Sequence, residues 1–158
     1  MRPMTTLRKW QIEQLNRHVP ILKFMIRNEE TKRLISRREK TDGWTAAEVI
    51  GHLLDCEKLF IQRVKMTMTQ NEPLLPFPPQ NDDVTNGRYN EKDPNNIIEE
   101  WNKVREEYIQ IMKEIPEESW ERKGRHPVYE PFSIDDQLAL ACRHTIQHFE
   151  QITRILKA

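Results

Sequence analysis

The sequence predicts an all-α fold, a four-helix bundle with long connectors after the second helix and before the last one. Four segments carry apolar residues at helical spacing, and no segment of any length alternates apolar and polar residues as a strand does. Ten prolines against four glycines favour helices that are joined by proline-marked loops. With a length of 158 residues, we expect a single domain that spans residues 1–158.

The first helix is expected from about Thr6 to Asn28. Its core face is a stripe at helical spacing, made of Leu15, Val19, Leu22 and Ile26. Pro20 lies inside this pattern and lacks a backbone donor, so we expect the helix to kink or restart there. The charged segment from Glu29 to Gly43 is expected to be a connector with a short turn of helix.

The second helix has a clear start, because Thr45 and Glu48 have the spacing of a capping box. Its apolar stripe predicts a helix to about Met68 and consists of Val49, Leu53, Cys56, Phe60 and Val64. His52 lies at the edge of this stripe. Residues 70–93 then hold four prolines, and a connector of this length often lies over a functional site.

The third helix is expected to begin after Asp93, an N-cap residue that precedes Pro94, and to end before Pro116. A second irregular stretch follows from Glu117 to Pro131. Ser133 and Asp136 predict another capping box at the start of the last helix. The stripe of that helix consists of Leu138, Cys142, Thr145, Phe149, Ile152 and Leu156, with His144 and His148 to one side.

Composition restricts the classes of partner. The 25 basic residues balance the 25 acidic ones, which gives no reason to expect nucleic acid or an anionic membrane as a partner. The N-terminal residues lack the continuous apolar region of a signal peptide, and no apolar run approaches the length of a transmembrane helix. Only Cys56 and Cys142 are present, so we expect reduced thiols in a cytoplasmic protein.

Three histidines form a candidate metal site. His144 and His148 are four residues apart, so both imidazoles project from one face of the last helix. Thr145 follows His144 where the zinc-protease motif has its glutamate, so this is a different kind of site. If the second helix faces the last one, His52 completes a set that could hold a divalent transition metal with open positions. Alternatively, each histidine is a half-buried helix residue with an ordinary hydrogen bond.

Other side chains near these histidines have two interpretations each. Cys56 follows His52 by one turn and is either a fourth ligand or a small core residue. Glu48 or Asp55 could orient the His52 ring, although Glu48 already belongs to the capping box. Arg63 could bind an anionic substrate group, but a solvated side chain is favoured. His126 is expected at the surface of a loop.

Several blocks resemble the DinB/YfiT-like superfamily over nearly the whole chain. They are WTAAEVIGHLLDCEKLFIQR at residues 44–63, RYNEKDP at 88–94, GRHP at 124–127 and HTIQHFEQI at 144–152. The resemblance implies an up-down-down-up bundle, often a homodimer, and one nickel or zinc ion held by His52, His144 and His148. Two departures are the pair Glu130-Pro131, where a glycine is usual, and Gln147, where an additional histidine is frequent.

For function, the resemblance and the histidine set together favour a metal-dependent enzyme. We expect a transferase that joins a low-molecular-weight thiol, such as bacillithiol, to an electrophilic small molecule, because no carboxylate is placed convincingly as a general base. The alternative is a metal-dependent hydrolase, and the second alternative is a non-catalytic bundle that binds metal or dimerises. Gln151, one turn beyond His148, is expected to orient what binds.

Overall fold

The computed structural model describes residues 4–158 and contains four long helices, α1 (Thr6–Ile26), α3 (Ala46–Thr69), α5 (Pro94–Glu114) and α6 (Ile134–Lys157). The remaining elements are short: α2 (Thr31–Ser36), α4 (Asn81–Asn86), and the 3-10 helices η1 (Tyr89–Glu91) and η2 (Glu117–Ser119). In the described part of the chain, the strands are limited to β1 (Lys123–Gly124) and β2 (Phe132–Ser133), which pair antiparallel. The predicted four-helix bundle is therefore confirmed.

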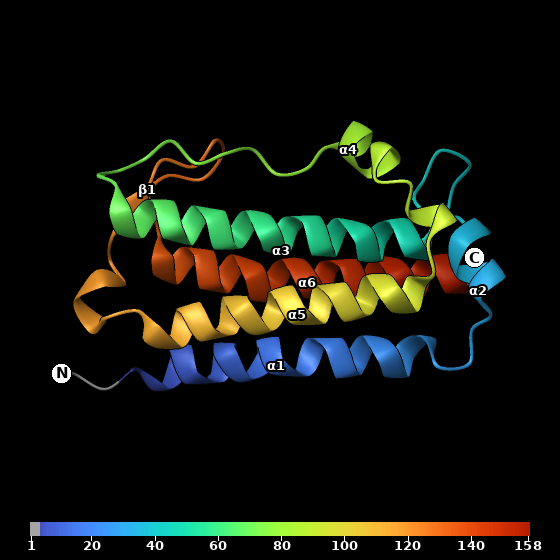
Figure 1. Cartoon of the computed structure of the whole chain (residues 1–158), viewed down its shortest axis with the longest axis horizontal. Coiled ribbons are helices and arrows are strands. Elements are labelled where there is room, and N and C mark those ends of the chain that lie inside the picture. Colours follow the sequence, from blue (N-terminus) through green and yellow to red (C-terminus); the bar gives the residue numbers. More distant parts are fainter. Residues whose placement is uncertain (1–3) are drawn as a thin grey trace.

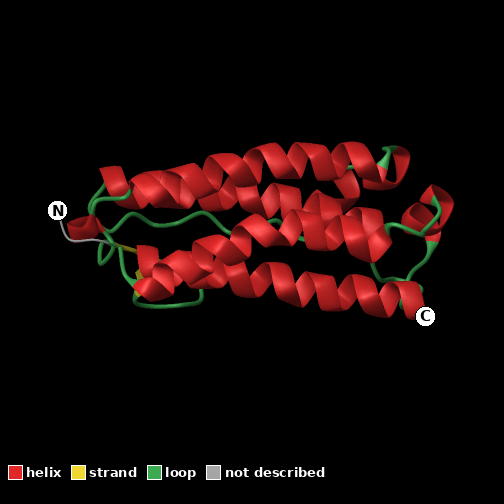
Figure 2. Cartoon of the chain, turned by 90° about the horizontal axis from the view of Figure 1, so that it is seen from below, coloured by secondary structure: helices red, strands yellow, loops and turns green. Residues whose placement is uncertain are grey.

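The helices run up, down, down and up. Figure 1 shows α1 and α6 pointing one way along the bundle and α3 and α5 pointing the other way. The long connector, residues 70–93, runs back along the outside of α3, which allows α5 to start at the same end as α3. Both α1 and α3 contact α5 and α6, so α3 lies beside α6. Figure 2 shows the long helices lying along the whole length of the molecule.

Local capping chemistry fixes the starts of α3 and α6. The Thr45 hydroxyl accepts a hydrogen bond from the Glu48 amide, and the Glu48 carboxylate accepts one from the Thr45 amide. Ser133 and Asp136 make the same reciprocal pair in α6. Both predicted capping boxes are therefore present. In α1, the helix continues through the exposed Pro20, so the predicted restart does not occur, and the alternative of a kink stays a prediction.

The core consists of two apolar clusters, one in each half of the bundle. The first includes Leu22, Ile50, Leu53, Trp101 and Ile152, and the second includes Leu15, Phe60, Tyr108, Met112 and Leu138. These residues lie on the inward stripes that helical spacing predicts. Within residues 4–158, no helix is both long enough and apolar enough to cross a membrane.

A buried ion pair lies between the two apolar clusters. Arg105 donates to both oxygens of Glu57, at 2.6 and 2.9 Å. Its remaining N–H groups donate to the Leu15 carbonyl, the His18 Nδ1 atom and the Thr145 hydroxyl. All five N–H groups of the guanidinium are thus used, and the network joins α1, α3, α5 and α6. His18, for which the sequence analysis predicts no role, is fully buried and accepts a hydrogen bond in this network.

The long connector is attached to the second irregular stretch. The Leu75 amide donates to the Arg125 carbonyl at 2.9 Å, and the Arg125 amide donates to the Pro73 carbonyl at 2.8 Å. Leu75 packs so closely on Gly124 that a Cβ atom there would lie 2.8 Å from the leucine side chain. Glycine at this position therefore allows the two connectors to pack together beside α3 (Figure 1).

Candidate metal centre

The register between α3 and α6 brings the three candidate histidines together. The Gln137 side chain in α6 donates to the Thr67 hydroxyl in α3 at 3.0 Å. The two helices are antiparallel, so residues that precede Thr67 in α3 lie beside residues that follow Gln137 in α6. Phe60 therefore lies beside His144. Their ring centroids are 5.6 Å apart. His52 and His148 then lie near the same stretch of the α3–α6 interface.

The Nε2 atom of His144 lies close to the Nε2 atoms of both other histidines. Nε2 of His144 is 3.3 Å from Nε2 of His52 and 3.1 Å from Nε2 of His148. Two nitrogens that each bind one ion at about 2.1 Å lie about 3.0–3.4 Å apart in tetrahedral or octahedral geometry. The two separations have the size that ligands of a shared ion require. We call His52, His144 and His148 the histidine cluster.

Gln151 positions the ring of His148. Its Oε1 atom lies 2.8 Å from Nδ1 of His148, and because an amide oxygen only accepts, Nδ1 must carry the proton. The unprotonated Nε2 atom, with its lone pair, is the one that lies close to His144. The sequence predicts that Gln151 orients what binds, and in the structure it fixes the tautomer of a candidate ligand.

Burial keeps the cluster neutral. It is the main cause that lowers the pKa of His52 to about 3, with a further contribution from His148. Burial also lowers the pKa of His144 to about 2, assisted by His148 and His52 and then by Arg105 and Arg63. The pKa of His148 is lowered by burial and is partly restored by Gln151. At neutral pH all three imidazoles therefore retain a free lone pair.

Trp44 covers the cluster on the side of the α3 N-terminus. Its ring centroid lies 4.9 Å from that of His52 and 6.3 Å from that of His148, with the latter pair stacked. Sequence reasoning missed this role, although the position of Trp44 directly before the Thr45 cap indicated that its side chain packs near the first turns of α3. The indole limits access of water to the histidines from this side.

Cys56 offers an alternative third ligand. The possible ligand atoms of His52, Cys56 and His144 all lie within 4.8 Å of one another. The sulfur, however, is 3.4 Å from Nε2 and 3.8 Å from Nδ1 of His52, and this near-equality places it beside the ring. An ion bound to Nε2 would lie straight ahead of that nitrogen. Burial also raises the pKa of the Cys56 thiol, so the histidine set fits better.

The carboxylates near His52 are engaged elsewhere. Glu48 closes the capping box and also accepts from Arg38 at 2.8 Å. Asp55 accepts from the Tyr89 hydroxyl at 2.7 Å. Glu57 is held by Arg105. The idea that Glu48 or Asp55 orients the His52 ring is therefore not supported, and neither is placed as a general base at the cluster.

Arg63 and His126 are both buried, contrary to the interpretation of a solvated arginine and a surface histidine. Arg63 is 2% exposed and donates from Nε and Nη2 to the Pro76 carbonyl at 3.1 and 2.6 Å. His126 is 6% exposed, and its Nδ1 atom accepts from the amides of Val128 and Tyr129, each at 3.0 Å. Both lie where the long connector meets the second irregular stretch.

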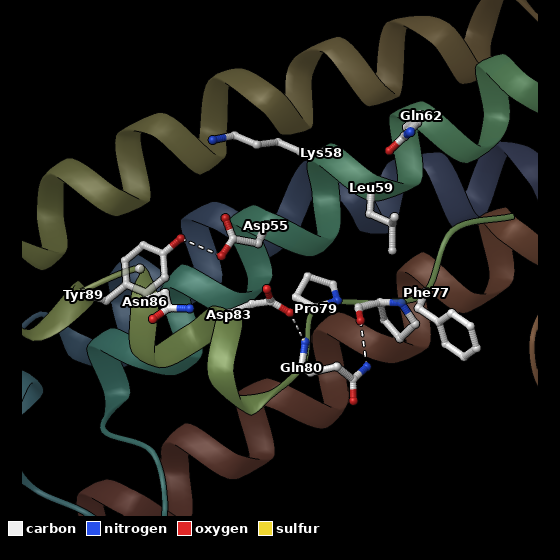
Figure 3. A pocket seen from close by; sticks show the side chains of 12 residues that line it. Asp55, Lys58, Leu59, Gln62, Phe77, Pro79, Gln80, Asp83, Asn86 and Tyr89 are labelled. Atoms are coloured by element: carbon white, nitrogen blue, oxygen red, sulfur yellow. Dashed lines mark hydrogen bonds between the residues drawn. The ribbon is translucent and has the colours of Figure 1, made fainter.

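A cavity of about 700 Å³ lies on the neighbouring face of α3, beneath the long connector (Figure 3). Figure 3 shows Asp55 and Leu59 of α3 on one side of it and Phe77, Pro79 and Gln80 of the long connector on the other, with Asn86 and Tyr89 at one end. Leu59 also lines the cavity and follows His52 by about two turns of helix. No histidine of the cluster lines the cavity, which has a size suited to a small molecule.

Comparison with known proteins places the chain in a family. Among solved structures, YfiT from Bacillus subtilis, described as a probable metal-dependent hydrolase with an unusual four-helix bundle topology, is similar. The TM-score is 0.83 at 18% sequence identity, with 99% of this chain and 90% of that chain covered, which shows a shared fold. A search of curated proteins finds no match. The family model of the DinB superfamily matches residues 10–152. This confirms the resemblance in the sequence, and the chain belongs to the DinB superfamily.

Proposed function

We propose that this protein is a metal-dependent enzyme that binds one divalent transition metal through His52, His144 and His148. The observation that carries the proposal is the approach of the three Nε2 atoms, at 3.3 and 3.1 Å around His144. Neutral imidazole nitrogens suit zinc and nickel, the two metals we expect. Three protein ligands leave positions open, which is the pattern of catalytic sites, whereas structural zinc sites have four protein ligands.

A metal in this site would lower the pKa of a bound thiol or water and so supply a nucleophile at neutral pH. The chain's own residues perform the supporting roles. Gln151 fixes the tautomer of His148, while Trp44 and Phe60 pack against the cluster and limit the access of water. Where water is excluded, electrostatic interactions with the substrate are stronger than in bulk water.

For the reaction, we favour transfer of a low-molecular-weight thiol, such as bacillithiol, to an electrophilic small molecule. Attack by water generally uses a nearby group to take up its proton. Of the carboxylates near His52 in sequence, Glu48 closes the capping box, and Asp55 and Glu57 are bound to Tyr89 and Arg105. Thiols are acidic enough to ionise without such a base when a cation is close.

Hydrolysis is the second candidate. It is favoured by the likeness to Bacillus subtilis YfiT, which is described as a probable metal-dependent hydrolase and shares the fold over 99% of this chain. The same three ligands and the same neighbouring cavity would serve this reaction. The two candidates differ only in whether the nucleophile is a thiol or water.

The metal content of purified protein tests the first step. We expect about one nickel or zinc ion per chain in the wild type by elemental analysis and a loss of that metal in His144→Ala. His18→Gln is the matched control, because His18 is a buried histidine of another helix whose role is to accept from Arg105. Equal metal in the wild type and His144→Ala would refute the histidine cluster as the ligand set.

A substrate panel tests the second step. Metal-loaded protein is incubated with several low-molecular-weight thiols and electrophiles, and separately with esters and amides. Consumption of thiol that depends on the intact cluster supports transfer. Release of acid without thiol consumption supports hydrolysis, and no turnover in either panel leaves the non-catalytic bundle as the better description.

A homodimer is part of the same proposal. The outer face of α1 presents large apolar side chains to solvent, with Leu7, Trp10 and Phe24 each more than 60% exposed. Such a face is suited to packing against a second copy. Light scattering should give twice the chain mass for the wild type and a lower mass for Trp10→Glu, and a monomeric wild type would contradict the proposal.

A further inference from the structure

We propose that Arg63 and His126 form a subsite for a substrate carboxylate, at the end of the α3–α6 interface next to the histidine cluster. This inference rests on the proposed function and adds a substrate class, small organic acids. The substrate would place its reacting group at the cluster and its carboxylate against Arg63.

The first observation is a buried cation without a counter-charge. Arg63 is 2% exposed, yet among residues 4–158 no carboxylate lies within ion-pair distance of its guanidinium. Its two hydrogen bonds go to one neutral acceptor, the Pro76 carbonyl, through Nε and Nη2. Buried charges are normally paired, as Arg105 is with Glu57. The Nη1 atom of Arg63 thus has N–H groups available for a ligand.

The second observation is a neutral donor on His126. Its Nδ1 atom accepts from two backbone amides, those of Val128 and Tyr129, so Nδ1 carries no proton. In the neutral ring the proton must then be on Nε2, which makes Nε2–H a hydrogen-bond donor. Among the described residues, the unpartnered side-chain atoms that are fully enclosed include neither this atom nor Nη1 of Arg63. Each of the two atoms therefore retains some exposure, through which a ligand could reach it.

The connectors bring these two donors together. Leu74 and Arg125 form a parallel bridge, so His126 continues beside the Leu75–Pro76 segment. Arg63 holds the carbonyl of Pro76 in that same segment. The positive charge of Arg63 also lowers the pKa of His126, after the larger effect of burial, which agrees with their closeness.

The subsite lies one helical turn from the histidine cluster. Phe60 contacts the ring of His144, and Arg63 follows Phe60 by about one turn, or about 5 Å along α3. The Cα–Cβ bond of Arg63 tilts towards the helix N-terminus, which is the side of Phe60 and His144. Since Arg63 carries one positive charge and His126 is neutral, the subsite matches a singly charged carboxylate better than a dianionic phosphate.

A matched pair of probes tests the subsite by binding, without turnover. Butyrohydroxamic acid and succinic acid monohydroxamate have the same chain length and the same metal-binding group, but only the second ends in a carboxylate. Both are titrated into cobalt-loaded protein, and binding is followed by the visible absorption of the cobalt. We expect the carboxylate probe to bind wild-type protein at least about tenfold more tightly, and this ratio to fall to about one in Arg63→Met.

Arg125→Met is the control variant. Arg125 is exposed and also donates to a connector carbonyl, that of Glu72, so its loss affects the connector without affecting the subsite. The ratio is expected to stay at the wild-type value. If Arg63→Met does not fold, Arg63→Lys is expected to lower the ratio, because an ammonium lacks the planar fork of the guanidinium. Equal binding of both probes to wild-type protein, or an unchanged ratio in the folded Arg63 variants, overturns the inference.

A measurement on metal-free protein separates this inference from the proposed function. If the protein takes up no cobalt, the metal proposal fails, but succinate can still be titrated while the ring signals of His126 are followed by NMR. We expect these signals to shift in the wild type and not in Arg63→Met. Absence of a shift in the wild type overturns the subsite, whatever the metal content.

Discussion

Nδ1 of His148 donates a hydrogen bond to Oε1 of Gln151 at 2.8 Å, and this contact determines which ring nitrogen is free. The free nitrogen, Nε2, lies 3.1 Å from Nε2 of His144. A residue that belongs to no candidate ligand set thus controls the orientation and basicity of one candidate ligand.

Replacement of this acceptor is expected to weaken metal binding. In Gln151→Leu the His148 ring can rotate or change tautomer, so we expect about tenfold lower affinity for zinc or nickel. The affinity is measured by competition with a chromophoric chelator. Gln147→Leu is the control, because Gln147 is an exposed residue one turn earlier on the same helix. Equal affinities for the two variants would show that Gln151 does not support the site.

Acid is expected to destabilise the metal-free protein through its buried histidines. The pKa of His18 falls to about 3 when the chain folds, because of burial first and the charge of Arg105 second. Below about pH 6.5 the unfolded chain binds a proton that the folded chain does not. Stability from His18 is therefore complete above about pH 6.5 and is lost as the pH falls towards 3.

The size of this effect can be measured with one variant. For His18 alone, the loss between pH 7 and pH 5 is about 2 kcal/mol. Urea denaturation of metal-free His18→Gln at these two pH values should show a smaller loss than the wild type by about this amount. Gln can still accept from Arg105. Identical pH dependence in the two proteins would mean that His18 is not held neutral in the fold.

The start of each main helix could be predicted because its cause is local. Thr45 with Glu48, and Ser133 with Asp136, satisfy the free amides of a helix end within four residues of sequence. The short helix α4 was missed because six residues carry too little periodicity to distinguish a helix from a loop. The restart expected at Pro20 does not occur, since an exposed proline in α1 does not stop the helix when both halves pack on one core.

The candidate site was only half predictable from the residues. Spacing places His144 and His148 on one helix face, but the approach of His52 depends on α3 lying beside α6, which is a property of the tertiary packing. The resemblance to the family supplied that missing relation. The pairing of Arg105 with Glu57 could not be predicted, because buried charges look the same in a sequence as solvated ones.

Loss of one partner of the buried ion pair is expected to be severe. In Arg105→Met the Glu57 carboxylate is left buried with Trp101 as its remaining donor, at 3.4 Å. We expect a loss of about 3–5 kcal/mol in the free energy of unfolding. The double variant Glu57→Leu/Arg105→Met should recover a large part of that loss, because no unpaired charge remains.

Chemical denaturation of the four proteins in this cycle gives the coupling energy. A double variant less stable than Arg105→Met would contradict the interpretation. It would mean that the Glu57 side chain, held by its remaining donor Trp101, still stabilises the bundle without Arg105.

Gly51 is expected to be required for the position of Tyr89. A Cβ atom on Gly51 would lie 2.2 Å from the Tyr89 ring, so Gly51→Ala must displace that ring and break its 2.7 Å hydrogen bond to Asp55. We expect a loss of about 1–3 kcal/mol by urea denaturation. In a Tyr89→Ala background the same change should instead be neutral or stabilising by up to about 1 kcal/mol, because alanine favours helix. A similar loss in both backgrounds would point to another cause.

Cys56 is expected to be dispensable for metal binding. Its sulfur lies beside the His52 ring, at 3.4 and 3.8 Å from the two nitrogens, and not ahead of the Nε2 lone pair. Cobalt-loaded wild-type protein should therefore lack the intense near-ultraviolet absorption of a sulfur-to-cobalt bond, and Cys56→Ala should keep the same metal content and visible spectrum.

Burial of the thiol, at 1% exposure, explains its presence as a core residue packed with Phe60 and Tyr108. A sulfur-to-cobalt band that disappears in Cys56→Ala would replace the three-histidine site by one in which a thiolate is a ligand, and the charge of the centre would then be lower by one unit.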